Sequence, residues 1–275
     1  MSVLSAWIPD KKGEDRMKIG LCIGGGGSRG YAVVPIIQKL LSEGIRFDAV
    51  SGCSVGSIIG SYLALNGNLD DFENEISKIN QFKFLRLIDF AGRKKSSILY
   101  GKKIKKFLNK EILKEKKFSD LKIPLFINST DLSTGKPYYF QEGFLIDGVM
   151  SSIAIPGVFP PYLYQGKILV DGGVCESLPI RILKEKVDKI IAVSLNEVGI
   201  SNIKIGLSDV LFKSLSIMMN QNVEFQDDPE VKFLKPVFTG KEANFLKFYK
   251  HSSYFQLGKK VIDEKIQEIK EWIGK

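Results

Sequence analysis

The sequence predicts an α/β fold whose central sheet is mainly parallel and covered by helices on both faces. Short apolar runs typical of buried strands alternate along the chain with stretches whose apolar residues recur at helical spacing. At 275 residues, 44% of them hydrophobic, the chain is long enough to bury a large core. Because parallel strands need helical crossovers between them, the alternation indicates a single α/β domain.

The individual elements follow from these patterns. The expected strands are 18–23, 47–51, 123–129, 138–141, 168–170 and 189–195. The expected helices are 31–43, 57–65, 101–113, 145–153, 208–223 and 254–272. We assign residues 18–275 to one domain. Residues 1–17 are rich in charged side chains and contain no apolar signal core, so we expect a flexible arm, with Met17 as an alternative start.

A serine lies in a small-residue turn between the second expected strand and the helix after it. Residues 52–56 read G-C-S-V-G, which is a G-x-S-x-G pattern centred on Ser54. A serine on a sharp strand-to-helix turn exposes its hydroxyl, and the helix directs unpaired N–H groups toward it. Gly52 and Gly56 suit such an elbow because a side chain there would crowd the turn. An ordinary turn is the alternative interpretation of this motif alone.

A glycine cluster follows the first expected strand. Residues 24–30 read G-G-G-G-S-R-G. Successive glycines allow backbone N–H groups to converge on one anion, either a phosphate or the oxyanion of an acyl-transfer intermediate. The cluster also matches the dinucleotide pattern G-x-G-x-x-G, which expects an acidic residue at the end of the next strand. Ser51 and Gly52 occupy that place, while Asp48 lies at the strand's start. The sequence therefore favours an oxyanion loop.

An aspartate lies at the start of a glycine turn, 117 positions after Ser54. The segment 169–173 reads L-V-D-G-G and places Asp171 at the end of an expected strand. Asp-Gly is a preferred β-turn dipeptide, so a plain turn is the alternative. In combination with the serine elbow and the glycine loop, Asp171 is the best candidate for a catalytic base.

Together these segments resemble the patatin-like phospholipases, in particular their compact bacterial members. The carrying segments are 25–30 (GGGSRG), 52–56 (GCSVG), 171–173 (DGG) and 151–161 (SSIAIPGVFPP). The resemblance runs from about Lys18 to about Val193. Cys53 and Val55 depart from it, since the family more often has Thr and Ala around its serine.

The resemblance implies a three-layer α/β/α fold and hydrolysis of lipid acyl esters by a Ser–Asp dyad. In that scheme Ser54 is the nucleophile and Asp171 the base. The amides around the glycines of the loop form the oxyanion hole, which Arg29 supports. The oxyanion-hole residues carried over are Gly25, Gly26, Gly27, Ser28, Arg29 and Gly30.

The single histidine of the chain, His251, allows a rival mechanism. The order Ser54, Asp171, His251 is that of the α/β-hydrolases, whose triad includes a histidine. His251 stands in the polar and aromatic stretch 248–253, outside any glycine-framed turn, which is typical of a surface histidine. We therefore expect a dyad, in which a partly desolvated carboxylate takes the serine proton.

Cofactor and location follow from composition. Cys22, Cys53 and Cys175 form an odd set without metal-ligand spacing, which indicates reduced thiols; no metal or cofactor is expected. No apolar run has the length of a transmembrane helix. We expect a cytoplasmic protein, peripheral at the membrane if it contacts one.

Basic residues are concentrated in one segment. Residues 93–117 contain eleven basic and two acidic side chains, an excess equal to the net charge of +9. Apolar residues at close to helical spacing run through it, so the segment suits a helix on an anionic membrane or a solvated helix that packs on the core. No motif indicates nucleic-acid binding. A second apolar stripe, Leu211, Leu215, Met218, Met219 and Val223, suits an acyl cleft or simple core packing.

The sequence as a whole predicts a serine hydrolase acting on carboxylic esters of lipids. Two alternatives belong to other classes: a nucleotide-binding oxidoreductase built on the glycine loop, and a non-catalytic lipid-binding module on the same scaffold. The missing acidic residue near Ser51 argues against the first. The joint presence of Ser54, Asp171 and the loop argues against the second. The head group, the acyl chain and the oligomeric state are not encoded in these motifs.

Overall fold

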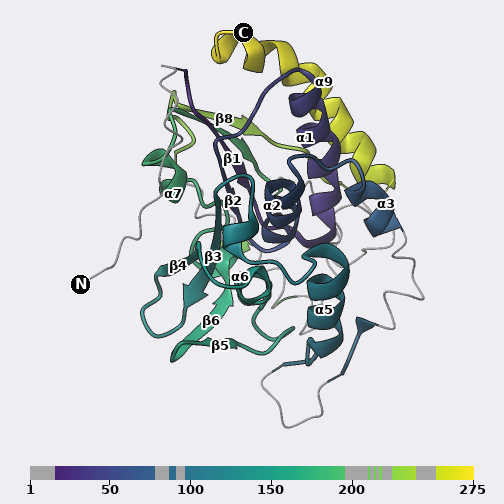
Figure 1. Ribbon diagram of the computed structural model, residues 1–275, viewed down its shortest axis with the longest axis vertical. Helices are drawn as coiled ribbons and strands as arrows, with labels where there is room; N and C mark the ends of the chain where they lie inside the picture. Colours follow the sequence, from purple (N-terminus) through teal and green to yellow (C-terminus); the bar gives the residue numbers. More distant parts are fainter. Residues whose placement is uncertain are drawn as a thin grey trace.

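A single mixed sheet forms the centre of the molecule. The computed structural model describes residues 16–77, 87–90, 97–195, 225–239 and 252–275, and the single positions 210, 214, 217 and 218. Within these residues the sheet has eight strands, ordered β5-β6-β3-β2-β1-β7-β8, with β4 paired to β3 (Figure 1). The prediction of an α/β fold with a mainly parallel sheet is confirmed.

Five consecutive strands of the sheet, from β3 to the edge strand β8, are parallel. These strands are β1 (Ile19–Ile23), β2 (Ala49–Gly52), β3 (Leu125–Asp131), β7 (Lys189–Val193) and β8 (Val231–Leu234). Every residue of β1, β2 and β3 is buried, as expected for strands covered on both faces.

One end of the sheet is antiparallel. β4 (Pro137–Phe140) and β6 (Lys167–Asp171) both pair antiparallel with β3, and β5 (Tyr162–Tyr164) pairs antiparallel with β6. The reversal has a consequence for the site. The end of β6 now lies at the same level of the sheet as the turn that follows β2.

Helices cover both faces of the sheet. Figure 1 shows α1 (Val33–Ser42), α2 (Val55–Asn66) and α9 (Ser252–Trp272) on one side and α7 (Arg181–Lys184) on the other. The remaining helical segments are η1 (Gly27–Ala32), α3 (Phe72–Ser77), α5 (Lys102–Phe107), η2 (Leu108–Ile112), η3 (Phe118–Asp120), α6 (Leu145–Ser152) and η4 (Gly172–Val174). The buried residues of α9 recur every three or four positions, so the apolar stripe of this helix packs onto α1 and η1.

The expected elements are found with small shifts at their ends. The expected helix at 101–113 is α5 followed by the π-helical turn η2. Seven short elements were not expected: α3, β5, α7 and β8, and the 3-10 helices η1, η3 and η4. Each has three to six residues, too few for a periodic pattern to stand out. Residues 1–15 of the predicted arm at 1–17, His251 and nearly all of the expected helix at 208–223 lie outside the described residues.

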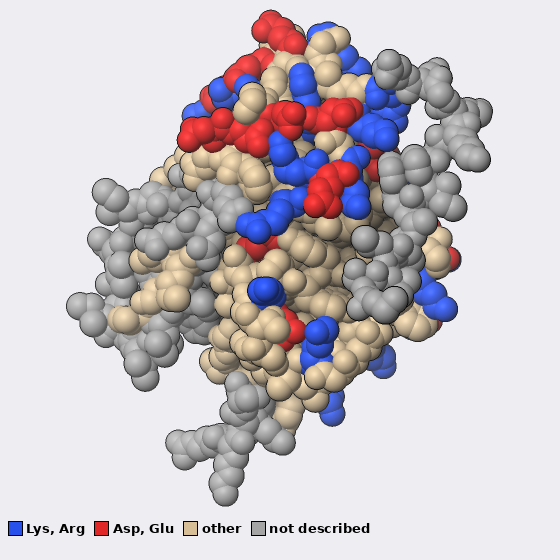
Figure 2. Space-filling model, turned by 90° about the vertical axis from the view of Figure 1, so that its left-hand side faces the viewer, with Lys and Arg blue, Asp and Glu red and all other residues tan. Residues whose placement is uncertain are grey.

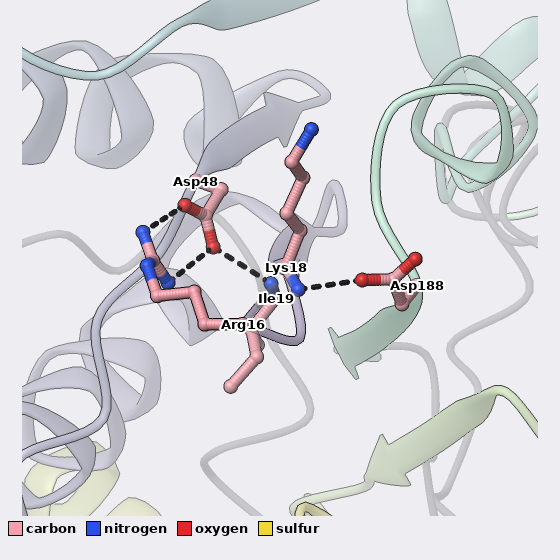
Figure 3. A network of polar contacts seen from close by, with 5 residues as sticks. All are labelled: Arg16, Lys18, Ile19, Asp48 and Asp188. Atoms are coloured by element: carbon pink, nitrogen blue, oxygen red, sulfur yellow. Dashed lines mark hydrogen bonds and ion pairs between the residues drawn. The ribbon is translucent and has the colours of Figure 1, made fainter. Parts of the chain in front are cut away.

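Two aspartates fix the amino end of β1 (Figure 3). The carboxylate of Asp48, which directly precedes β2, accepts the N–H of Ile19 at 2.8 Å and is paired with Arg16. Asp188, which directly precedes β7, accepts the N–H of Lys18 at 2.7 Å. Both carboxylates therefore accept backbone N–H groups at the amino end of β1, whereas the glycine loop follows the carboxyl end of this strand.

Candidate active site

Ser54 occupies a strained turn at the carboxyl end of β2. Its backbone angles are φ 52° and ψ −119°, and α2 begins at the next residue. Such a conformation costs about 1–3 kcal/mol and persists only where its surroundings impose it. A Cβ on Gly52 would stand 2.5 Å from the Gly56 carbonyl oxygen, and one on Gly56 would stand 2.2 Å from the Ile23 carbonyl oxygen. The two glycines of the motif thus allow the tight approach that the elbow needs.

The glycine loop packs directly against this elbow. A Cβ on Gly25 would lie 3.3 Å from the Ser54 Cβ. The amide of Gly25 donates to the Ser177 carbonyl oxygen at 3.1 Å, so it is already engaged, contrary to its expected place in the oxyanion hole. In the described part of the chain the amides of Gly26 and Gly27 have no acceptor. Gly27 adopts φ 56°, a left-handed conformation that glycine accepts without strain.

The next residues fasten the loop to the rest of the fold. The buried guanidinium of Arg29 donates to the carbonyl oxygens of Leu195 at 2.8 Å and Gly26 at 3.3 Å. Burial lowers the pKa of Arg29 to about 10, so it remains charged at neutral pH. The hydroxyl of Ser28 donates to the Tyr254 oxygen at 3.2 Å. A Cβ on Gly30 would meet the side chain of Val55 at 2.5 Å, so this glycine lets η1 approach α2.

The register of the sheet brings Asp171 to the same level as Ser54. Gly52 stands opposite Ile127 of β3, and Asp171 stands opposite Ser129, two residues further along β3. Ser54 is likewise two residues beyond Gly52. The end of β6 and the elbow after β2 therefore meet on one edge of the sheet, although 117 residues separate them in sequence.

The Asp171 carboxyl group is fully buried. Its Oδ1 accepts the N–H of Gly173 at 2.8 Å, and no described group makes a hydrogen bond of ordinary geometry to Oδ2. Burial raises the pKa of Asp171 from its usual 3.8 to about 6, an effect that the Gly173 N–H and the Ser54 hydroxyl partly offset. The effect of the Ser54 hydroxyl on this pKa indicates that it lies beside the carboxylate.

Cys53, which lies between Ser54 and Gly52 in the elbow, is a poor candidate for a second nucleophile. All three cysteines are free thiols, and the Cys53 Sγ lies 4.0 Å from the Asp171 Oδ1. Burial and the neighbouring Asp171 raise the pKa of the Cys53 thiol well above its usual range. A thiol in that state is neutral at physiological pH and is a poor nucleophile.

Comparison with known protein families shows which family contains these segments. The family model described as patatin-like phospholipase matches residues 21–184, which include the glycine loop, the Ser54 elbow and Asp171. The chain belongs to the patatin-like phospholipase family. The sequence-based resemblance is confirmed by this match.

Relatives of this patatin-like chain differ from it in length. It is 36% identical over 186 residues to an uncharacterized NTE family protein of Mycobacterium tuberculosis, which covers 67% of this chain and 51% of that protein. It is 28% identical over 216 residues to lysophospholipase NTE1 of Meyerozyma guilliermondii, covering 78% of this chain and 15% of that protein. The chain thus spans about half the length of the mycobacterial relatives that it matches. Among solved structures, VipD from Legionella pneumophila aligns with a TM-score of 0.48 and 14% identity, over 90% of this chain and 67% of that chain.

The structure of this patatin-like chain also bears on the alternative interpretations. Asp48, the nearest acidic residue to a dinucleotide ribose position, is held at the amino end of β1. His251, the histidine of the rival triad, lies outside the described residues. In the described residues no group of three potential ligands is arranged to hold a metal ion. No helix in the described part of this patatin-like chain is long and apolar enough to span a membrane.

The apolar stripe of the basic segment packs inward. Leu108, Ile112 and Leu113 are buried, and Ile104 and Phe107 pack partly against the same core. The stripe is therefore unavailable for insertion into a membrane. The interpretation of this segment as a helix packed on the core describes its apolar side. Its charged side is open, because Lys102, Lys103 and Lys106 are exposed; residues 93–95 lie outside the described residues.

Ser152 contacts the Ser54 elbow, although no sequence motif singled it out. It is the last residue of α6 and is fully buried, and its hydroxyl oxygen accepts the N–H of Ser54 at 2.8 Å. The sequence contains a signal for the segment, because 151–161 is one of the stretches that carry the family resemblance. The contact itself joins residues 98 positions apart and follows no local pattern.

Proposed function

We propose that this chain is a serine lipid acyl hydrolase that cleaves carboxylic esters through a Ser54–Asp171 dyad. One observation carries the proposal: the strained Ser54 elbow faces a fully buried carboxylate whose pKa is raised to about 6. A base with that pKa is ionised at neutral pH and is stronger than an ordinary carboxylate. The family, and the lysophospholipase name of a relative, support lipid esters as the substrate class.

The proposed reaction has two acyl-transfer steps. Ser54 Oγ attacks the ester carbonyl carbon while Asp171 accepts the hydroxyl proton, and the carbonyl oxygen becomes an oxyanion. The amides of Gly26 and Gly27 are the candidate donors to that oxyanion. The intermediate collapses, the alcohol leaves with the proton from Asp171, and an acyl-serine remains. Water, deprotonated by Asp171, then attacks this ester; Asp171 returns the proton to Ser54 Oγ, and the carboxylic acid is released.

Covalent labelling tests this proposal directly. A fluorophosphonate probe should add to the chain once, and peptide mass analysis should place the adduct on Ser54. Because Asp171 must be ionised to accept the proton, the labelling rate should fall about tenfold per pH unit below about pH 6. Labelling at another residue would show that Ser54 is not the nucleophile. A labelling rate independent of pH from about 5 to 8 would show that Asp171 is not the base.

We further propose that the exposed lysines of α5 attract the enzyme to anionic lipid. The attraction is electrostatic only, since the apolar side of the segment is buried. On the face in Figure 2 the charges are mixed: Lys and Arg are interspersed with Asp and Glu in its upper part, and its lower part carries few charges. A one-signed cluster such as that on α5 is what an anionic surface attracts most strongly.

Vesicle binding checks this second proposal. Lys102→Gln with Lys103→Gln should weaken sedimentation with anionic vesicles by roughly tenfold at low salt, and high salt should weaken the parent similarly. The matched control is Lys259→Gln with Lys260→Gln, a pair of adjacent exposed lysines on α9. Hydrolysis of a small soluble ester should be unchanged in both variants. Equal binding of the two variants would show that α5 is only a solvated helix.

A further inference from the structure

One short segment holds the backbone of both proposed catalytic residues. The hydroxyl oxygen of Ser152 accepts the N–H of Ser54 at 2.8 Å, and two residues later the carbonyl oxygen of Ala154 accepts the N–H of Asp171 at 2.9 Å. Ser54 follows β2 and Asp171 ends β6, and β3 lies between these two strands in the sheet. The end of α6 therefore bridges two elements that are not neighbours in the sheet.

The two sides of the Ser54 backbone are secured differently. Its carbonyl oxygen accepts two hydrogen bonds, from the N–H of Ser57 at 2.9 Å and from the Ser57 hydroxyl at 2.6 Å. Its N–H makes one hydrogen bond in the described part of the chain, to Ser152. The carbonyl side is thus doubly held, whereas the amide side depends on a single buried hydroxyl. A strained conformation with φ 52° needs both sides to be held.

Neighbouring Ser151 provides an internal comparison. Ser151 and Ser152 are both fully buried at the end of α6. The Ser151 hydroxyl has no hydrogen-bond partner among the described groups, whereas the Ser152 hydroxyl is engaged with Ser54. The two positions have the same side chain, burial and helix, and their hydroxyls differ in this hydrogen bond.

We infer that Ser152 is a positioning residue that keeps Ser54 aligned with Asp171 by accepting the Ser54 N–H. The inference rests on the proposed function, because it assigns Ser152 a role toward the dyad. Removing the hydroxyl leaves the Ser54 N–H without its acceptor in a buried place and frees the elbow to relax. The Ser54 Oγ then spends less time in reach of Asp171, which slows the chemical step and leaves substrate binding intact.

The experiment compares Ser152→Ala with Ser151→Ala in the full chain. Ester hydrolysis by Ser152→Ala should show a kcat reduced roughly tenfold to a hundredfold with KM unchanged, and fluorophosphonate labelling should slow in parallel. Ser151→Ala should match the parent in both measurements, because no described group makes a hydrogen bond to its hydroxyl. Ser152→Thr keeps the acceptor oxygen and should recover part of the lost kcat.

The outcomes separate this inference from the proposed function. If the parent is labelled at Ser54 and Ser152→Ala reacts as fast as Ser151→Ala, the positioning role is wrong and the dyad stands. A Ser152→Ala variant whose KM rises while kcat is unchanged would also overturn the inference, since it would place Ser152 at the substrate. If the parent is not labelled at Ser54, the proposed function fails first. Circular dichroism and thermal unfolding of each variant establish that the folded protein is being compared.

Discussion

Ser54→Ala should lower ester hydrolysis by at least about a thousandfold and abolish fluorophosphonate labelling. The reason is chemical: without Oγ no acyl-enzyme forms, and the Gly26 and Gly27 amides are left with no nucleophile to assist. The alanine variant should fold like the parent, because alanine keeps the Cβ that already occupies this turn. Ser61→Ala is a matched control, since Ser61 is also a buried serine; it lies on α2, and its hydroxyl donates to the Ser57 carbonyl oxygen. A Ser54→Ala protein that labels like the parent would disprove the assignment.

The same position gives a stability measurement that is independent of activity. Ser54 and alanine both experience the strain of φ 52°, whereas glycine adopts this region without a Cβ clash. Ser54→Gly should therefore be more stable than Ser54→Ala by about 1 kcal/mol, once the greater unfolded-state freedom of glycine is subtracted. Chemical denaturation of the two inactive variants compares them directly. Equal stability, or a more stable alanine variant, would mean that the elbow is not strained.

The site could be read from the sequence because its parts follow element ends. The loop after β1, the elbow after β2 and the turn after β6 each carry a local glycine motif, and each element was expected within a few residues of where it lies. What local motifs do not encode is which backbone groups are already engaged. Gly25 illustrates this, because its amide is bonded to Ser177, a residue 152 positions away.

Long-range contacts also decided the features that sequence patterns left open. The apolar residues near helical spacing in 104–113 are equally compatible with a membrane and with the core, and only the tertiary packing of Leu108, Ile112 and Leu113 shows that they face inward. The antiparallel direction of β6 likewise depends on its pairing with β3 rather than on its composition. Ser152 was overlooked for the same reason, since its acceptor role exists only once α6 lies against the elbow.

Asp171→Asn should remove most of the activity and at the same time stabilise the protein. The loss should be roughly a hundredfold to ten-thousandfold, because the amide cannot accept the Ser54 proton. His251→Ala should keep most of the activity if the mechanism is a dyad. The reverse pattern, with a large loss for His251→Ala and a small one for Asp171→Asn, would favour an α/β-hydrolase type of triad.

The expected stabilisation follows from the raised pKa of Asp171. The carboxyl group titrates near 3.8 in the unfolded chain and near 6 in the folded protein. Between these values the folded state holds the proton more tightly, so stability falls as pH rises through this window and remains lower above it. The shift of about two units corresponds to about 3 kcal/mol, an upper value for the gain on replacing the charged group by asparagine at about pH 7.5.

Asp131→Asn provides a control of opposite sign. Asp131 also ends a strand and is almost buried, but its pKa is lowered by the N–H of Ser133 and by Lys167. Its charged form favours folding above the usual carboxyl pKa, so its replacement should destabilise the protein at neutral pH. Urea unfolding at about pH 4 and 7.5 measures both variants. Destabilisation by Asp171→Asn at the higher pH would show that the Asp171 charge is well solvated or paired. A buried carboxylate that costs folding stability and supports turnover is typical of a group retained for chemistry.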